Sequence, residues 1–160
     1  MPQEPYEALW NRALWYLGRR AYGTRELREK LLRRPPEKPI PAQEDVERAL
    51  ARLAELGLLN DSARARQLAE ACARKGYGAR RLQMELRRLG LENEAPPPPQ
   101  DETGAIARLL ETKYAARLRD EKGCRAVFQA LLRRGFPAAD IRQAMRDAAE
   151  CREDMLEESE

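Results

Sequence analysis

The sequence contains no histidine, and this absence removes several kinds of chemistry at once. Ser-His-Asp and Cys-His catalysis both need an imidazole, as do the usual histidine-bearing metal sites. The glycine-rich patterns GxxxxGK[ST] and GxGxxG are also missing, so no phosphate-cradling loop is predicted. The many carboxylates alternate with arginines on predicted helices, where surface ion pairs are their usual role. We therefore expect a protein that binds rather than catalyses, with no cofactor and no metal site.

Long apolar runs are absent as well. None approaches the ~18 residues that span a membrane, and the opening MPQEPYEALW lacks the basic-then-apolar pattern of a signal peptide. The three cysteines, Cys72, Cys124 and Cys151, are widely spaced and form no CxxC motif. Neither a disulfide framework nor a zinc site is indicated. These features predict a location in the reducing cytoplasm, with no membrane partner. We also expect the protein to be a monomer.

β-Branched residues are scarce, whereas Leu, Ala, Arg and Glu dominate. The dominant residues are strong helix formers, so the predicted fold class is all-α. Charged residues reach 36%, and the formal net charge of +3 hides an asymmetry, because arginine crowds the first third of the chain and glutamate its end. This distribution predicts a polyanionic or acidic partner, although a solvated charged surface would give the same composition.

An internal repeat organises the chain. Three segments align without gaps: GTRELREKLLRR from Gly23, GARRLQMELRRL from Gly78 and GCRAVFQALLRR from Gly123. Each has arginine at plus two and plus ten, and apolar residues at plus four and plus eight that form a helical core face. Gly78 follows Gly23 by 55 residues and Gly123 follows Gly78 by 45, so the repeat is degenerate. Further amphipathic helices flank each repeated helix, which predicts three tandem three-helix, helix-turn-helix-like units.

Proline and glycine mark the boundaries of these units. Proline-rich segments at 35–41 and 96–99 interrupt the first two units, and Gly57 is a predicted helix C-cap. Asn60 or Asp61 is the predicted N-cap of the next helix. Units of this size have marginal cores alone, so we expect them to stack into an elongated, curved array. The predicted division into repeats 1, 2 and 3 and an acidic, disordered tail is 1–60, 61–117, 118–150 and 151–160.

The repeated arginines lie roughly opposite the core positions on a helical wheel. Those at plus ten meet the negative end of the helix dipole, which explains them without any partner. Those at plus two stand in the first turn, where positive charge is unfavourable, so an intramolecular carboxylate or an external anion must hold them. The predicted basic binding face consists of Arg19, Arg20, Arg25, Arg28, Arg33, Arg34, Arg80, Arg81, Arg87, Arg88, Arg125, Arg133 and Arg134.

Aromatic residues offer a second possible contact with nucleic acid. Trp10, Trp15, Tyr16, Tyr22 and Tyr77 could stack on bases if their rings were exposed. Their helical spacing favours packing in the core and at turns instead. The core interpretation predicts that these rings are covered by protein.

The residues in this order resemble the RecX family. ALWYLGRRAYGTRELREKLLRR, residues 13–34, is similar to the opening of the family's first repeat. GLLNDSARARQLAEACARKGYGARRLQMELRRLGL, residues 57–91, resembles its central signature, and LLRRGFPAADIRQAM, residues 131–145, resembles the end of its third repeat. The resemblance covers roughly residues 9–149. One departure is Arg64, which stands where the family usually has an aromatic residue.

The resemblance implies a partner and an activity. RecX proteins bind RecA recombinase in the groove of its filament on single-stranded DNA, block strand exchange and filament ATP hydrolysis, and in some cases contact DNA. Two alternatives stay open, a DNA-binding protein without sequence preference and a helical adaptor that needs no nucleic acid. If the basic face makes the contact, Arg25→Glu combined with Arg80→Glu should weaken binding without unfolding the protein.

Overall fold

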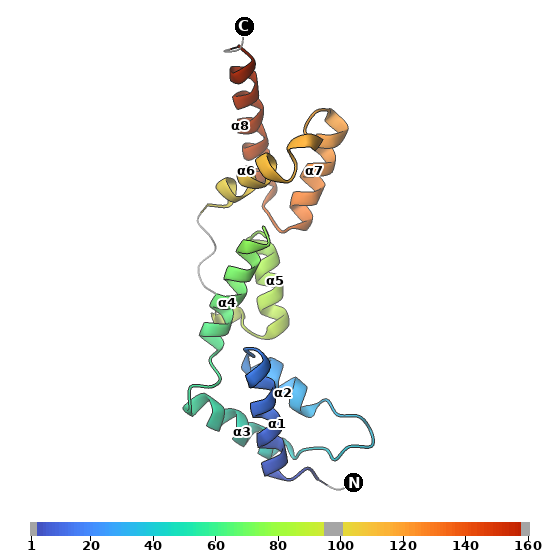
Figure 1. Ribbon diagram of the computed structural model, residues 1–160, viewed down its shortest axis with the longest axis vertical. Coiled ribbons are helices and arrows are strands. Elements are labelled where there is room, and N and C mark those ends of the chain that lie inside the picture. Colours follow the sequence, from blue (N-terminus) through green and yellow to red (C-terminus); the bar gives the residue numbers. More distant parts are fainter. Residues whose placement is uncertain (1–2, 95–100, 158–160) are drawn as a thin grey trace. The chain divides into compact units, whose positions relative to one another are not determined.

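The computed structural model describes residues 3–94 and 101–157, and these residues are largely helical (Figure 1). Apart from one isolated bridge between Gln3 and Ile40, they contain no β-structure, so the predicted all-α class is confirmed. None of their helices is both long enough and apolar enough to cross a membrane. The predicted proline spacer at 96–99 lies outside the described residues. The helices are α1 (Tyr6–Arg19), α2 (Thr24–Leu32), α3 (Gln43–Glu55), α4 (Asp61–Arg74), α5 (Ala79–Leu89), η1 (Glu92–Glu94), α6 (Glu102–Thr112), η2 (Ala115–Arg117), α7 (Glu121–Arg133) and α8 (Ala138–Glu157).

The chain forms two compact units. Unit 1 comprises Met1–Gln67 and Leu86–Ala95, and unit 2 comprises Leu68–Glu85 and Pro96–Glu160. Residues of the second predicted repeat are therefore divided between the two units. The repeat boundaries and the curved array stay predictions.

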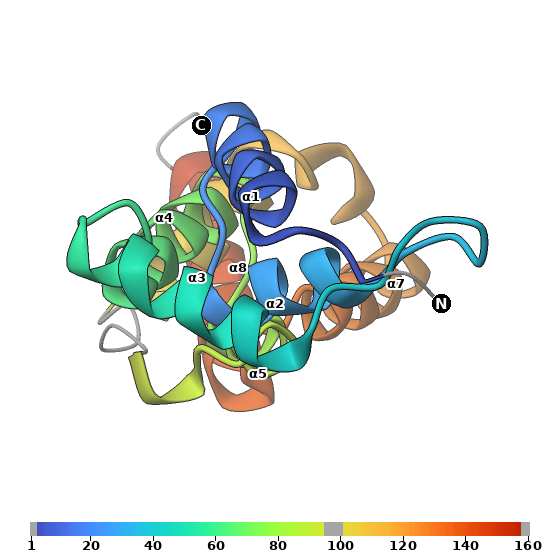
Figure 2. The ribbon, with the colours of Figure 1, turned by 90° about the horizontal axis from the view of Figure 1, so that it is seen from below.

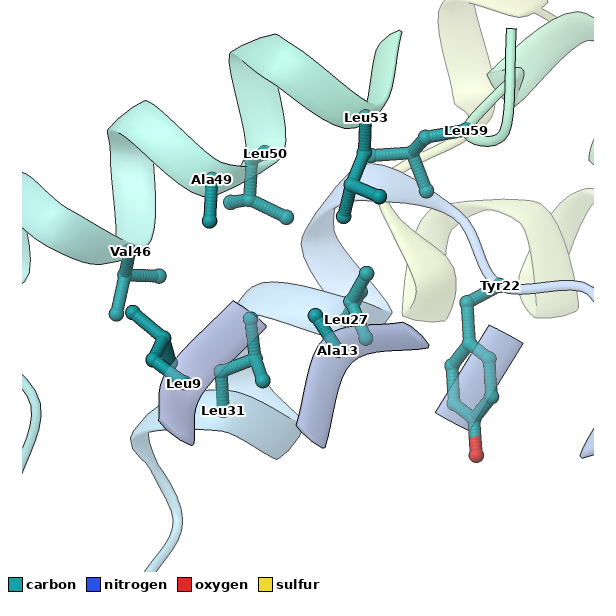
Figure 3. Close-up of a cluster of buried hydrophobic side chains, with 10 residues drawn as sticks. All are labelled: Leu9, Ala13, Tyr22, Leu27, Leu31, Val46, Ala49, Leu50, Leu53 and Leu59. Carbon is teal, nitrogen blue, oxygen red and sulfur yellow. The ribbon is translucent and has the colours of Figure 1, made fainter. Parts of the chain in front are cut away.

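Unit 1 is built on a three-helix core. Helices α1, α2 and α3 pack against one another, as two perpendicular views show (Figures 1 and 2). Their apolar residues recur at intervals of three and four, which puts them on one face of each helix. Figure 3 shows these side chains converging on one another, and each fully buried leucine contributes about 1.5–3 kcal/mol. The cluster contains Leu9, Ala13, Tyr22, Leu27, Leu31, Val46, Ala49, Leu50, Leu53 and Leu59.

The start of α4 is hydrogen-bonded to the start of α2 within unit 1. Asn60 caps α4 by accepting a hydrogen bond from the Ala63 N–H at 2.9 Å, so it is the N-cap of the two residues predicted for that role. Asp61 instead accepts from the backbone N–H of Thr24 at 2.7 Å and from its hydroxyl at 3.1 Å. A carboxylate of α4 thus accepts a hydrogen bond from a backbone N–H group at the N-terminus of α2 that has no partner within that helix.

Arg64 takes part in the same junction. Its Nε lies 3.1 Å from Glu26, whose carboxylate also accepts from the Gly23 N–H at 3.0 Å and from Arg20 at 3.1 Å. The Arg64 side chain is 18% exposed and that of Glu26 10%. The position where the family usually has an aromatic residue is therefore filled here by one side of a largely buried ion pair.

Replacing Glu26 with Gln should destabilise unit 1 in a pH-dependent way. Burial alone would raise the pKa of Glu26, but hydrogen bonds from Gly23 and Arg64, the Arg64 charge and a hydrogen bond from Arg20 hold this pKa below its usual value. The stabilisation is therefore present above the unfolded pKa of 4.5 and lost as pH falls through the folded value. We expect a loss of about 1.5–3 kcal/mol at pH 7 that shrinks toward pH 3, measured by urea unfolding. A loss that is the same at both pH values would contradict this assignment.

Unit 2 has its own core, formed by α6, α7 and α8. Helix α6 packs along α8, and α7 packs against α8 and η2. The buried residues again follow helical spacing, with Phe136 in the turn between α7 and α8. The cluster contains Ile106, Leu110, Tyr114, Leu118, Val127, Leu131, Phe136, Ile141 and Ala144.

Helix α8 continues to Glu157, past Cys151, where the sequence predicted a disordered tail. The residues after Cys151 include Arg, Glu, Met and Leu, which favour helix. Arg152 also holds this end of the helix, because it donates to the carbonyl of Leu118 at 3.0 Å and to that of Ala148 at 3.2 Å. Residues 151–157 are therefore helical, and residues 158–160 lie outside the described part of the chain.

The repeated glycines mark a contact that occurs in both units. In unit 1 a Cβ on Gly23 would lie 3.3 Å from Leu91, the residue after the α5 C-cap. In unit 2 a Cβ on Gly78 would lie 2.6 Å from the carbonyl oxygen of Gly135, which precedes Phe136. Phe136 follows Leu91 by 45 residues, the same interval that separates the second and third repeats. The turn after α5 thus packs against the start of α2, and the turn after α7 packs against the start of α5.

Candidate basic interaction surface

At the start of each of the three basic helices, some backbone N–H groups are bonded to other parts of the protein. Carboxylates accept at each start: Glu26 and Asp61 at α2, Glu102 at α5 and Asp120 at α7. At α5 two further N–H groups donate to the carbonyls of the α7–α8 turn at 2.8 and 3.1 Å. A helix N-terminus binds anions through unsatisfied N–H groups, and at α5 the N–H groups of Gly78, Ala79 and Arg80 are occupied. A polyanion at the start of α5 would therefore contact side chains.

Several predicted arginines of unit 1 are held within the protein. Each guanidinium donates to a carboxylate or a carbonyl, and Arg20 also lies over the ring of Tyr22 at 3.7 Å. The partners are Glu26 for Arg20, Glu29 for Arg25, Glu47 for Arg28, and Glu4 with the Pro39 carbonyl for Arg34. The first-turn arginine of α2 is thus held by an intramolecular carboxylate, one of the two possibilities predicted for it.

In unit 2 the same is true of three more predicted arginines. Arg81 pairs with Glu85 at 3.1 Å, and Arg125 pairs with Glu121. The guanidinium of Arg134 donates to the Tyr114 hydroxyl at 3.1 Å and to the carbonyls of Lys75 and Gly76 at 2.8 and 3.1 Å. These contacts tie the end of α7 to the turn between α4 and α5, so Arg134 has a structural role.

The other predicted arginines are exposed. Arg19 lies over the Trp15 ring at 4.6 Å. Within the described residues, Arg19, Arg33, Arg80, Arg87 and Arg133 have no carboxylate partner, and Arg88 is also exposed. Exposed guanidinium groups without a partner are the ones best able to contact an external anion.

Two of these arginines lie on helices whose ends are hydrogen-bonded to each other in unit 2. The backbone N–H of Arg80 donates to the carbonyl of Gly135 at 3.1 Å, and Gly135 is two residues after Arg133. Both side chains are exposed. The junction of α5 and α7 therefore presents two cations that the sequence places 53 positions apart.

The aromatic prediction holds for most of the rings and fails for Trp15. Tyr22 is 8% exposed, and Trp10 and Tyr16 pack against the core of unit 1. Trp15 is 55% exposed. It follows Leu9 by six residues, about 240° around the helix, which faces away from the core. A helical wheel drawn for α1 would have identified it.

Among the described residues of unit 2, Glu102 is the one carboxylic acid whose pKa is shifted upward. Burial raises the pKa of this carboxyl, the hydrogen bond from the Ala79 N–H opposes the effect, and the charge of Asp140 adds to it. A raised folded pKa means stability that is present below the unfolded pKa of 4.5 and lost as pH rises through the folded value.

Glu102→Gln should therefore stabilise unit 2 at neutral pH, because an amide oxygen can still accept from Ala79 without a buried charge. We expect a gain of up to about 1 kcal/mol at pH 7 and no gain at pH 4, measured by urea unfolding. A loss of stability at pH 7 would show that the charged carboxylate is the better cap.

The described residues contain no group of three or more side chains suited to hold a metal ion. Cys72 is buried, and burial raises the pKa of its thiol, which makes it a poor nucleophile. What these residues define is an all-helical protein with repeated basic helices.

Comparison with known proteins gives this class a family. Residues 10–40 match the family described as RecX, first three-helix domain. The Regulatory protein RecX of Deinococcus radiodurans is 34% identical over 154 residues, 92% of this chain and 72% of that one. The Regulatory protein RecX of Escherichia coli K12 is 33% identical over 156 residues, 91% of this chain and 94% of that one. The chain therefore belongs to the RecX family.

A solved structure agrees with this fold. The crystal structure of RecX from Lactobacillus salivarius matches with a TM-score of 0.71 at 19% identity. The match covers 89% of this chain and 95% of that one. At this identity the likeness supports the helical fold alone.

Proposed function

We propose that this protein is a cytoplasmic monomer that binds RecA filaments on single-stranded DNA and inhibits their ATP hydrolysis and strand exchange. The observation that carries the proposal is similarity to Regulatory protein RecX over nearly the whole chain. The exposed arginines support it, because a filament on DNA presents phosphates and carboxylates. The proposal includes single-stranded DNA as a partner, contacted directly or through RecA.

Binding to DNA without RecA is the second candidate, favoured by the same exposed arginines. Because the start of α5 is occupied by a carboxylate and two carbonyls, phosphates there would contact side chains. Such binding would fall steeply as salt is raised. Binding that requires RecA and weakens little with salt would favour the filament.

The test is RecA ATP hydrolysis on single-stranded DNA, with this protein added well below the RecA concentration. We expect the rate to fall at substoichiometric amounts, because a filament regulator acts on many subunits at once. Inhibition that appears only when there is enough protein to cover the DNA would favour the DNA-binding alternative. No effect at any concentration would contradict the proposal.

Reversing the charge of Arg80 and Arg133 should weaken this inhibition about 10-fold or more, which corresponds to at least ~1.4 kcal/mol. This pair tests the surface more directly than Arg25 with Arg80, because Arg25 is already paired with Glu29. Arg108→Glu with Arg119→Glu is the matched control, with the same charge change at exposed positions outside the predicted face. Equal inhibition by both double variants would remove Arg80 and Arg133 from the site.

A further inference from the structure

Unit 2 contains an open groove that none of the predicted basic residues enters. It lies between α6, η2 and α8 and encloses about 700 Å³. Alanines and leucines dominate its lining, among them Ala107, Leu110, Ala144 and Ala148. Alanine side chains end at Cβ, so a partner can approach the backbones of α6 and α8 closely. The groove is large enough for a row of aliphatic side chains from one helix of a partner.

The charge at the edge of this groove is negative. Glu111 and Asp147 line it and are both exposed. The basic lining residue, Arg152, has its guanidinium bonded to the carbonyls of Leu118 and Ala148. Neither carboxylate forms an ion pair within the described residues. Arg152 keeps its positive charge, so the lining carries two carboxylates and one guanidinium, and lysine or arginine beside an apolar stripe would be attracted to the two carboxylates.

We propose that the groove binds an amphipathic helix of a partner protein, with apolar side chains in the groove and basic ones beside Glu111 and Asp147. The identity of the partner rests on the proposed function, which makes it a RecA subunit of the filament. The molecule then has two contacts of opposite character, exposed arginines for polyanions and an acidic, apolar groove for a basic helix. Charge complementarity of this kind mainly determines which partner is accepted and how fast it associates.

The first experiment measures binding of fluorescently labelled protein to RecA filaments assembled on single-stranded DNA. We expect Glu111→Lys with Asp147→Lys to weaken binding 10-fold or more. Glu44→Lys with Glu70→Lys is the control, because it makes the same charge change at exposed carboxylates outside the groove, and it should bind at least as well as wild type. Helical content by circular dichroism should be unchanged in both, since all four side chains are exposed.

The outcomes separate this inference from the proposed function. If wild-type protein does not bind filaments, the proposed function fails. If wild type binds and the groove variant binds equally well, the groove is not the contact and the inference is overturned. If the wild type forms dimers that the groove variant abolishes in sedimentation, a second copy occupies the groove, which also overturns the inference.

The native thiol at the edge of the groove gives a second measurement. Cys151 lines the groove and is exposed, whereas Cys72 is buried. In a Cys124→Ser background, N-ethylmaleimide should modify Cys151 several-fold more slowly when RecA filaments are present. Unchanged reactivity of Cys151 in filament-bound protein would contradict occupation of the groove.

Discussion

Gly78→Ala should lower the free energy of unfolding of unit 2 by about 3 kcal/mol, a large effect for one methyl group. The added Cβ would lie 2.6 Å from the carbonyl oxygen of Gly135 and 2.7 Å from the backbone nitrogen of Phe136. These are backbone atoms, so no side chain can rotate away to make room. The hydrogen bonds from Gly78 and Arg80 to the same turn would have to lengthen as the helices separate.

Hydrogen exchange read by mass spectrometry is the suitable measurement, because it reports each helix by itself. We expect faster exchange in α5, α7 and the start of α8. Gly18→Ala is the matched control: its Cβ would meet nothing within 4 Å, and the residue is in α1. Removing a helical glycine should stabilise by up to about 1 kcal/mol. Equal effects of the two substitutions would contradict the close contact at Gly78.

The helices themselves could be predicted from the sequence because local signals define them. Amphipathic spacing located the core residues of α2, α3 and α7, and Gly57 has the expected positive φ of 71° at the end of α3. The repeated glycines were visible too, but their reason was not. A Cβ on Gly78 would overlap the backbone of Gly135, and the 56 residues between them carry no local sign of this contact.

The basic surface was predictable only in part, for a related reason. The pairs Arg25–Glu29 and Arg125–Glu121 are four residues apart on one helix and could be read directly from the sequence. Arg134 contacts the backbone of Lys75, 59 residues away, and only the fold brings these groups together. Composition gives the number of arginines, whereas tertiary contacts decide which of them remain free to bind.

The groove in unit 2 could not be predicted from the sequence either. Ala107, Ala144 and Ala148 look like ordinary helix formers in the sequence, and the acidic residues near them look like solvated surface. Their function as a lining depends on α6 lying along α8. The arginine pattern in the sequence therefore indicates the candidate basic surface but gives no sign of the groove.

The turn between α7 and α8 should prove the most sensitive point of unit 2, with Phe136→Ala costing about 3–5 kcal/mol. Phe136 is 1% exposed, so its removal leaves a cavity in the core formed by α6, α7 and α8. This cavity adjoins the backbone contact between Gly78 and the α7–α8 turn. Phe128→Ala is the matched control, since Phe128 is in the same unit but only half-buried, beneath Arg142. Urea unfolding and hydrogen exchange should show a smaller loss for Phe128→Ala, about half as large or less. The amides of α1 to α3 should keep their protection in both variants, because the core of unit 1 contains neither ring. If both substitutions cost the same, the contact at the turn adds nothing to ordinary burial, and the repeated junction is not what holds unit 2 together.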